Sequence, residues 1–152
     1  LRTLLLSATQ GEGTLATVFH EYGPYRGDLQ AQRSGVMIAM GSGEAVAFAI
    51  FTLQDRGEFF VGPGAPLYEG LVVGRHNKDT DLVVNLTKGK KLTNVRSAGS
   101  DDAVKLVPPR VMTLEEALEF INPDELVEVT PSAIRIRKAL LREVDRKRAA
   151  RG

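Results

Sequence analysis

A polar, basic stretch at residues 85–102 carries the groups in this chain that are best suited to bind phosphate. It contains four cations and no acidic residue before Asp101, and the cations are Lys88, Lys90, Lys91 and Arg96. Thr93 and Asn94 add neutral hydrogen-bonding groups beside them. Flexible ammonium groups, a guanidinium and neutral donors are the groups that contact nucleic-acid backbones. The stretch therefore predicts a loop that touches RNA, and the alternative is a solvated hairpin tip whose lysines only keep the protein soluble.

The C-terminal end carries a second concentration of positive charge. From residue 135 onward the chain has eight Lys or Arg against two acids, a local balance of +6. Because the whole chain carries +1, residues 1–134 must carry −5. Such asymmetry is typical of a surface that faces nucleic acid or another anionic partner. The cations that we assign to RNA binding in this part are Arg142, Arg146, Lys147 and Arg148.

Residues for catalysis or metal binding are sparse. The chain has no cysteine and two histidines, which excludes cysteine-ligated metals and disfavours a histidine-rich site. Residues 89–91 resemble the end of a phosphate loop, but the first glycine of that motif is missing. The acidic pairs fall in turns or in a first helical turn, where carboxylates complement the helix dipole. We therefore expect no catalytic residue, metal site or cofactor in this segment, and no apolar run approaches the length of a membrane span.

The candidate aromatic and histidine groups are expected to play structural parts. Four phenylalanines could stack on bases, as on an RNA-binding sheet, but their apolar neighbours favour a place in the core; they are Phe48, Phe51, Phe59 and Phe60. We expect His20 to be a packing residue and His76, in a polar tip, to be exposed. Neither is expected to bind a metal.

Short strands separated by Gly and Pro must position these groups. From residue 34 the pattern predicts a mainly β fold with minor α, a small barrel-like or rolled sheet. Gly41 and Gly43 favour a tight hairpin between the first two strands, and 45–51 is apolar on both faces, as in a central strand. The predicted strands are residues 36–40, 44–53, 59–61, 71–75, 82–86, 104–107, 126–129 and 134–138.

Helices are expected at three places. Thr113 and Glu116 form a capping box at the start of a helix that reaches about residue 121. A basic helix is expected within 139–151. Apolar spacing over 1–9 indicates a short helix, followed by an extended segment at 15–22 and a Gly/Pro-rich domain boundary.

Several long blocks of the sequence resemble one family. They include GEAVAFA, LQDRG, YEG, GKKLTN, LVPP, TLEEALEFI, DELVEVTP and IRIRK, and together they cover nearly the whole chain. They are similar to the C-terminal part of the TypA/BipA family of translational GTPases. The N-terminal residues, LSATQGEGTLATVFHEYGPYRG, resemble the end of that family's preceding domain, which is related to the last domain of elongation factor G.

The resemblance implies both a division into domains and a role. It makes residues 1–22 the incomplete end of an α+β domain and residues 23–152 the family-specific C-terminal domain. It implies a module that docks on the bacterial large ribosomal subunit in the cytoplasm and contacts ribosomal RNA and A-site tRNA. The parent would act in large-subunit assembly and in adaptation to stress and cold. Residues 85–102 match the loop that reaches the tRNA, whereas Arg75, Asn77 and Lys78 match no fixed motif.

Catalysis is expected outside this segment. In the family, GTP and Mg²⁺ belong to an N-terminal GTPase domain, so the segment itself would bind and not catalyse. The alternative is a protein-interaction or linker domain whose surface charge is incidental. A carrier domain of the biotinyl type ranks well below both, because the tip that would present a modifiable lysine lacks a Met-Lys-Met motif. We also expect self-association through the N-terminal remnant, because an incomplete sheet tends to pair with another chain.

Overall fold

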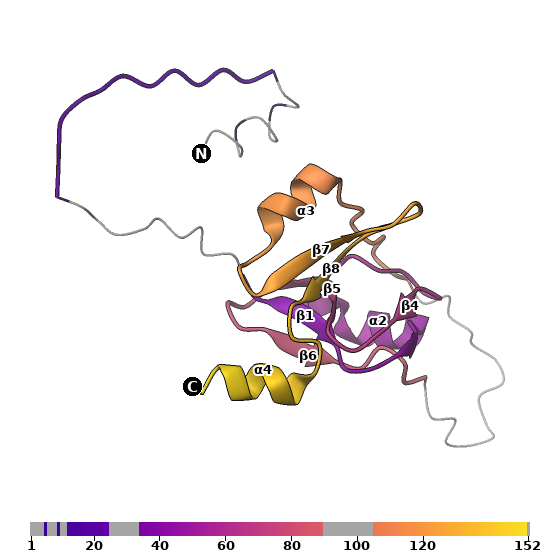
Figure 1. The fold of residues 1–152 in the computed structure, drawn as a ribbon. Helices are drawn as coiled ribbons and strands as arrows, with labels where there is room; N and C mark the ends of the chain where they lie inside the picture. Colours follow the sequence, from indigo (N-terminus) through magenta and orange to yellow (C-terminus); the bar gives the residue numbers. More distant parts are fainter. Residues whose placement is uncertain (1–4, 6–8, 10–11, 25–33, 90–104, 152) are drawn as a thin grey trace, which may run out of the picture. The chain divides into compact units, whose positions relative to one another are not determined.

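A computed structural model describes residues 5, 9, 12–24, 34–89 and 105–151 of the chain (Figure 1). These residues belong to two compact units, Leu1–Ala31 and Gln32–Gly152. In the first unit, the Thr9 amide donates to the Leu5 carbonyl at 3.0 Å, which is the spacing of a helical turn. Residues 12–24 form no helix or strand, and His20 is exposed, so the prediction that it packs in a core is wrong.

The second unit is built on an open six-stranded sheet. Its strand order is β6-β1-β5-β8-β7, and β3 also pairs with β5. β1 and β6 are parallel, and the other pairs are antiparallel. The strands are β1 (Val36–Ala39), β3 (Gly57–Phe59), β5 (Leu71–His76), β6 (Leu82–Val84), β7 (Glu125–Val129) and β8 (Ile134–Lys138). A separate two-stranded sheet joins β2 (Gly43–Glu44) to β4 (Pro66–Leu67).

Three short α-helices and a 3₁₀ turn complete the described part of this unit. They are α2 (Ala47–Leu53), η1 (Gln54–Arg56), α3 (Leu114–Phe120) and α4 (Glu143–Ala149). The mainly β fold with minor α is therefore confirmed. The described strands do not close into a barrel, because β6 and β7 remain at the two ends of the strand order.

Two apolar clusters cover the two faces of the sheet. Met37 and Ala39 of β1 pack in the cluster that includes α2, while Val36 and Ile38 pack in the cluster that includes α3. All four side chains are buried, as expected for a strand whose two faces are both covered. Figure 1 shows α2 and α3 on either side of this sheet.

The prediction of a central strand at 45–51 is wrong, because most of this segment is the helix α2. Ala49 and Ile50 are the buried residues of α2, and the Ile50 amide donates to the carbonyl of Val46, the N-cap four residues earlier, at 3.1 Å, which is a helical period. Phe51 lies outside the core with 41% of its surface exposed, and Phe48 is half-buried. The run looked apolar on both faces because these two rings occupy positions that a strand would have buried.

The predicted hairpin between residues 36–40 and 44–53 is also wrong. β1 pairs with β5 and β6, which occupy both of its edges, and the short β2 pairs with β4 instead. Gly43 has φ +146°, which a side chain would disfavour. The glycines therefore serve a turn that leads away from β1, and not a tight return onto it.

The other predicted elements lie close to their expected places. β5, β6, β7 and β8 agree with the predictions within about two residues, and β3 begins two residues early. The Thr113–Glu116 capping box is confirmed, with both reciprocal hydrogen bonds present. Residues 105–107 form no strand; there the side chain of Gln54 accepts from the Val107 amide at 3.3 Å and so satisfies one backbone group.

Candidate nucleic-acid interface

The basic helix α4 is anchored where it begins. The backbone N–H of Glu143 donates to a carboxylate oxygen of Glu69 at 3.1 Å, which fixes the first turn. Gly70 follows with φ +88°, and a Cβ at this glycine would lie 2.7 Å from the Cα of Leu141. The chain that leads into α4 therefore passes against Gly70, where only glycine leaves room.

The four cations assigned to this part are not equivalent. Arg146 donates from one guanidinium nitrogen to the carbonyls of Leu140 and Leu141, which precede the helix. Lys147 forms an ion pair with Glu143 one turn earlier, and this ammonium lowers the pKa of the Glu143 carboxyl. Arg142 and Arg148 are exposed and form no ion pair within the described part of the chain. Those two guanidinium groups are the ones free to meet an external phosphate.

Only the first of the predicted loop cations lies within the described residues. Lys88 is exposed, and it follows a turn in which the Asn85 side chain accepts from the amide and the hydroxyl of Thr87, at 3.0 and 2.9 Å. Such a turn redirects the chain immediately after β6. The remaining predicted contacts lie outside the described residues; they are Lys90, Lys91, Thr93, Asn94 and Arg96.

The described residues do not bring Lys88 and α4 into one cluster. Lys88 lines a hollow against α2, whereas α4 is held at Glu69 by its first turn. Of the weaker candidates, Arg75 donates to the Ser34 hydroxyl at 2.7 Å and Asn77 donates to the Asp55 carbonyl at 3.1 Å. Arg75 therefore links β5 to the residue range before β1, and Asn77 links the 76–80 tip to η1.

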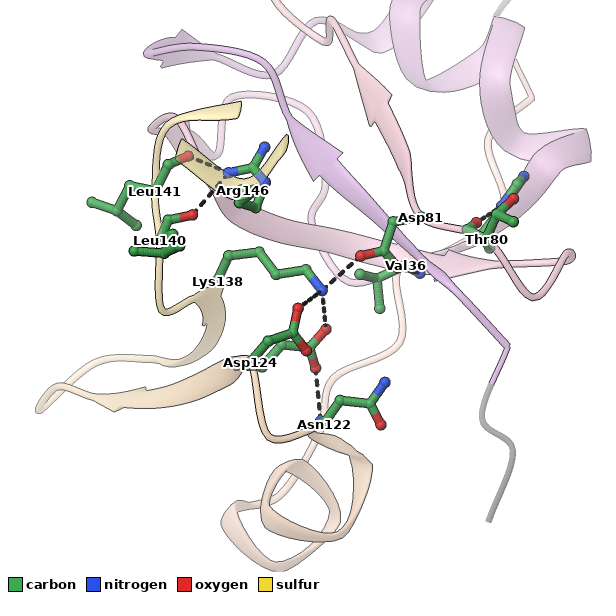
Figure 2. A network of polar contacts seen from close by, with 11 residues as sticks. Val36, Thr80, Asp81, Asn122, Asp124, Lys138, Leu140, Leu141 and Arg146 are labelled. Atoms are coloured by element: carbon green, nitrogen blue, oxygen red, sulfur yellow. Dashed lines mark hydrogen bonds and ion pairs between the residues drawn. The ribbon is translucent and has the colours of Figure 1, made fainter. Parts of the chain in front are cut away.

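A buried ammonium group, that of Lys138, lies at the end of β8, four residues before Arg142 (Figure 2). The side chain of Lys138, at the end of β8, is only 2% exposed, and its Nζ lies 2.6 Å from Asp81, 2.8 Å from Asp124 and 2.9 Å from Glu125. The Asp81 carboxylate also accepts from the Val36 amide at 2.9 Å, and Glu125 accepts from the Asn122 amide at 3.0 Å. One ion network thus joins the starts of β1, β6 and β7 to the end of β8.

The network keeps Lys138 charged. Burial alone would lower the pKa of Lys138, but its hydrogen bonds to Asp124, Asp81 and Glu125 outweigh that effect and raise the pKa above its ordinary value. The three carboxylates lie within 4.8 Å of one another, an arrangement that could hold a metal ion. Here the ammonium group lies in contact with all three and supplies the positive charge.

The predictions from the sequence did not include this network, although the pattern of β8 contains a signal for it. Residues 134, 136 and 138 share one face of a strand, so the side of β8 that carries Ile136 into the core must also carry Lys138 inward.

The prediction that His76 is exposed is wrong. His76 is buried, and its Nδ1–H donates to the Thr80 carbonyl at 2.6 Å. The 76–80 tip is therefore closed by its own histidine.

No helix among the described residues is long and apolar enough to span a membrane.

Comparison with known proteins gives one consistent family. The profile of the family described as TypA/BipA C-terminal domain matches residues 34–143. The chain is 54% identical over 152 residues to a protein of Salmonella typhimurium named large ribosomal subunit assembly factor BipA. Proteins of the same name from Escherichia coli K12 and from Buchnera aphidicola of Schizaphis graminum are 54% and 49% identical over 151 residues. In each case the match covers 99% of this chain and 25% of the relative, so the chain spans about a quarter of the length of these relatives.

Proposed function

This chain belongs to the TypA/BipA family, as its C-terminal domain, and on that premise we propose that it is a ribosome-binding module that contacts RNA. The observation that carries the proposal is the family match over residues 34–143, together with relatives that are named large ribosomal subunit assembly factors. The module would bind the large subunit in the bacterial cytoplasm during its assembly. It would contribute binding and not chemistry.

Free cations on the surface support an RNA contact. Arg142 and Arg148 present guanidinium groups that no described acid neutralises, and Lys88 presents an exposed ammonium at the foot of the 85–102 loop. Guanidinium and ammonium groups bind phosphate by charge-assisted hydrogen bonds, and neutralising a phosphate releases a counterion. Lys90, Lys91, Thr93, Asn94 and Arg96 would extend this contact along the loop and toward a tRNA, and Arg146 and Lys147 would add to it from α4.

The Lys138 network would support this binding indirectly. It fixes the end of β8 four residues before Arg142, while the Glu69 carboxylate fixes the first turn of α4. A cation whose backbone is held in place loses less conformational entropy when it binds. The network would therefore position α4 for RNA without touching RNA itself.

The parent protein would supply the reaction. GTP hydrolysis, with Mg²⁺, would take place in an N-terminal domain like that of other translational GTPases, and residues 1–22 would be the end of a preceding α+β domain. The binding module would couple that hydrolysis to the state of the ribosome, and the adaptation to stress and cold would follow from its effect on subunit assembly.

A protein-interaction role is the second candidate. An apolar hollow of about 670 Å³ lies between residues 110–112 and the turn that joins β7 to β8. Val111 and Val129 are both exposed beside it. A ribosomal protein could use this surface, and binding through it would depend little on salt.

Co-sedimentation of the full-length protein with purified large ribosomal subunits tests the proposal. Replacing Arg142 and Arg148 by Ala should weaken binding, and each single variant should bind more weakly than Lys105→Ala, which makes the same change of charge outside the assigned site. Thermal unfolding should be nearly unchanged in all of them, because exposed cations contribute little to stability. Equal binding by the α4 variants and Lys105→Ala, with salt-independent association, would favour the protein-interaction role instead.

A further inference from the structure

A hollow of about 430 Å³ lies between α2 and β6, on the side of the sheet away from α3. Its volume lies within the roughly 300–1,000 Å³ range of small-molecule sites. The lining residues that matter here are Phe48, Thr52, Arg56, Val83, Asn85 and Lys88. Of the residues assigned to RNA binding from the sequence, Lys88 is the one among the described residues that lines this hollow.

One wall of the hollow presents an aromatic ring. Phe48, Thr52 and Arg56 are spaced four residues apart, so they follow one side of α2 and its 3₁₀ extension. The Thr52 hydroxyl donates to the Phe48 carbonyl at 2.7 Å, which leaves its oxygen lone pairs available as acceptors. Phe48 is half-buried, so part of its ring remains open to a ligand.

The opposite wall is a free strand edge. β6 lies at the end of the strand order, so one of its edges has no partner strand in the described part of the sheet. The Val84 carbonyl accepts from the Met40 amide at 2.9 Å, so the backbone of Val84 faces β1. Because successive residues of a strand turn their backbone groups to opposite edges, the amide and carbonyl of Val83 face away from β1. A donor and an acceptor are thus available side by side.

The described charges around the hollow have one sign. Arg56 and Lys88 are both exposed lining residues, no carboxylate of the described residues lines the hollow, and neither cation forms an ion pair with a described acid. An aromatic face, a backbone donor–acceptor pair and two cations together match the base, the base edge and the phosphate of a nucleotide. An extended peptide could also pair with a strand edge, but its backbone carries no charge for these cations to neutralise.

We propose that this hollow binds one unpaired nucleotide of an RNA strand. Its base lies against Phe48, its hydrogen-bonding edge meets the backbone of Val83, and Arg56 and Lys88 hold the adjacent phosphates. The site rests on the proposed RNA-binding function and gives it a preference for single-stranded RNA over duplex. The preference follows because a base within a duplex is stacked on both faces, its Watson–Crick edge is paired, and its other edge faces a deep, narrow major groove.

Fluorescence of 2-aminopurine in a short single-stranded oligoribonucleotide tests the site directly, because stacking on an aromatic ring quenches this base. The full-length protein is compared with Phe48→Leu, which keeps an apolar side chain but removes the ring. Phe51→Leu is the matched control, because Phe51 is a more exposed ring on the same helix and does not line the hollow. Phe48→Leu should bind the single strand at least about fivefold more weakly and lose the quenching, whereas Phe51→Leu should behave as wild type.

Two further measurements separate this site from the proposed function. An oligonucleotide with an abasic position in place of 2-aminopurine should bind wild type and Phe48→Leu equally, and large-subunit binding should persist in both. If Phe48→Leu and Phe51→Leu bind and quench the single strand alike while both still bind the large subunit, the nucleotide site is wrong and the proposed function stands. If wild type binds neither RNA nor the large subunit, the nucleotide site and the proposed function are both wrong. Matched thermal midpoints for the two variants ensure that any difference lies in binding.

Discussion

Replacing the buried Lys138 by Met should destabilise the fold strongly. Met is also unbranched and adaptable, so the apolar part of the side chain is largely preserved while the ammonium is lost. The change leaves Asp81, Asp124 and Glu125 with their oxygen atoms within 4.8 Å of one another and no cation between them. Removing one partner of a buried ion network typically costs about 3–5 kcal/mol, and we expect a loss of that size.

The individual carboxylates should contribute unequally. Glu125 has no exposed side-chain surface, whereas the Asp124 side chain is 62% exposed. Water can replace the ammonium at an exposed carboxylate, so Asp124→Asn should cost about 1 kcal/mol or less. Glu125→Gln should cost more, because its amide must stay in a buried site shaped for a carboxylate beside an ammonium.

Urea denaturation of these three variants, followed by circular dichroism over a range of pH, measures the effect. The raised pKa of Lys138 means that its stabilising contribution is complete below the unfolded-state value of about 10.4 and is lost as the pH rises through the folded-state value. The difference in unfolding free energy between wild type and Lys138→Met should therefore be large at neutral pH and small at strongly alkaline pH. A loss below about 1 kcal/mol at neutral pH, or a larger loss for Asp124→Asn than for Glu125→Gln, would refute this reasoning.

Four further outcomes follow from the packing, the helix cap and the N-terminal residues. Ile50→Ala should cost about 2–5 kcal/mol in urea denaturation and Phe48→Ala clearly less, because Ile50 is buried and Phe48 is not; the reverse ranking would place the core of α2 wrongly. Thr113→Ala should cost about 1 kcal/mol by loss of the helix cap. The pKa of Glu116 is lowered first by the hydrogen bond from the Thr113 amide and then by Arg110. The stability that Glu116→Gln loses should therefore be present above the unfolded pKa of about 4.3 and should vanish as the pH falls through the folded pKa. A difference in unfolding free energy between wild type and Glu116→Gln that does not change with pH would contradict this. Self-association through residues 1–22 should appear in analytical ultracentrifugation as a dimer that deletion of those residues abolishes, and a monomer at all concentrations would count against it.

Local signals predicted much of this fold. The capping box located α3 because both of its hydrogen bonds involve residues three apart in sequence. Alternating side chains located β8, and a turn between two short runs located β7. These features depend on neighbours in the chain, so pattern alone can identify them.

Long-range pairing and partner choice could not be predicted in the same way. β1 takes a parallel partner, β6, more than forty residues later, and no local pattern specifies that pairing. α2 was mistaken for a strand because Phe48 and Phe51 are apolar but lie outside the core. At the candidate interface, the sequence predicted a basic C-terminal helix. Only the structure distinguishes Arg142 and Arg148 from Arg146 and Lys147, which already have partners within the chain.

The salt dependence of RNA binding tests the central claim most directly. Each phosphate contact that is lost should lower the slope of log K against log salt by roughly 0.7–0.9. For the full-length protein and ribosomal RNA, Lys88→Ala, Lys90→Ala and Lys91→Ala combined should flatten the slope by about two, and Arg142→Ala with Arg148→Ala by about 1.5, with little change in melting temperature. Thr93→Ala and Asn94→Ala should weaken binding with little change of slope, because their contacts release no counterion. Slopes identical to wild type in both cation variants would contradict the account, because the loop and α4 would then touch no phosphate.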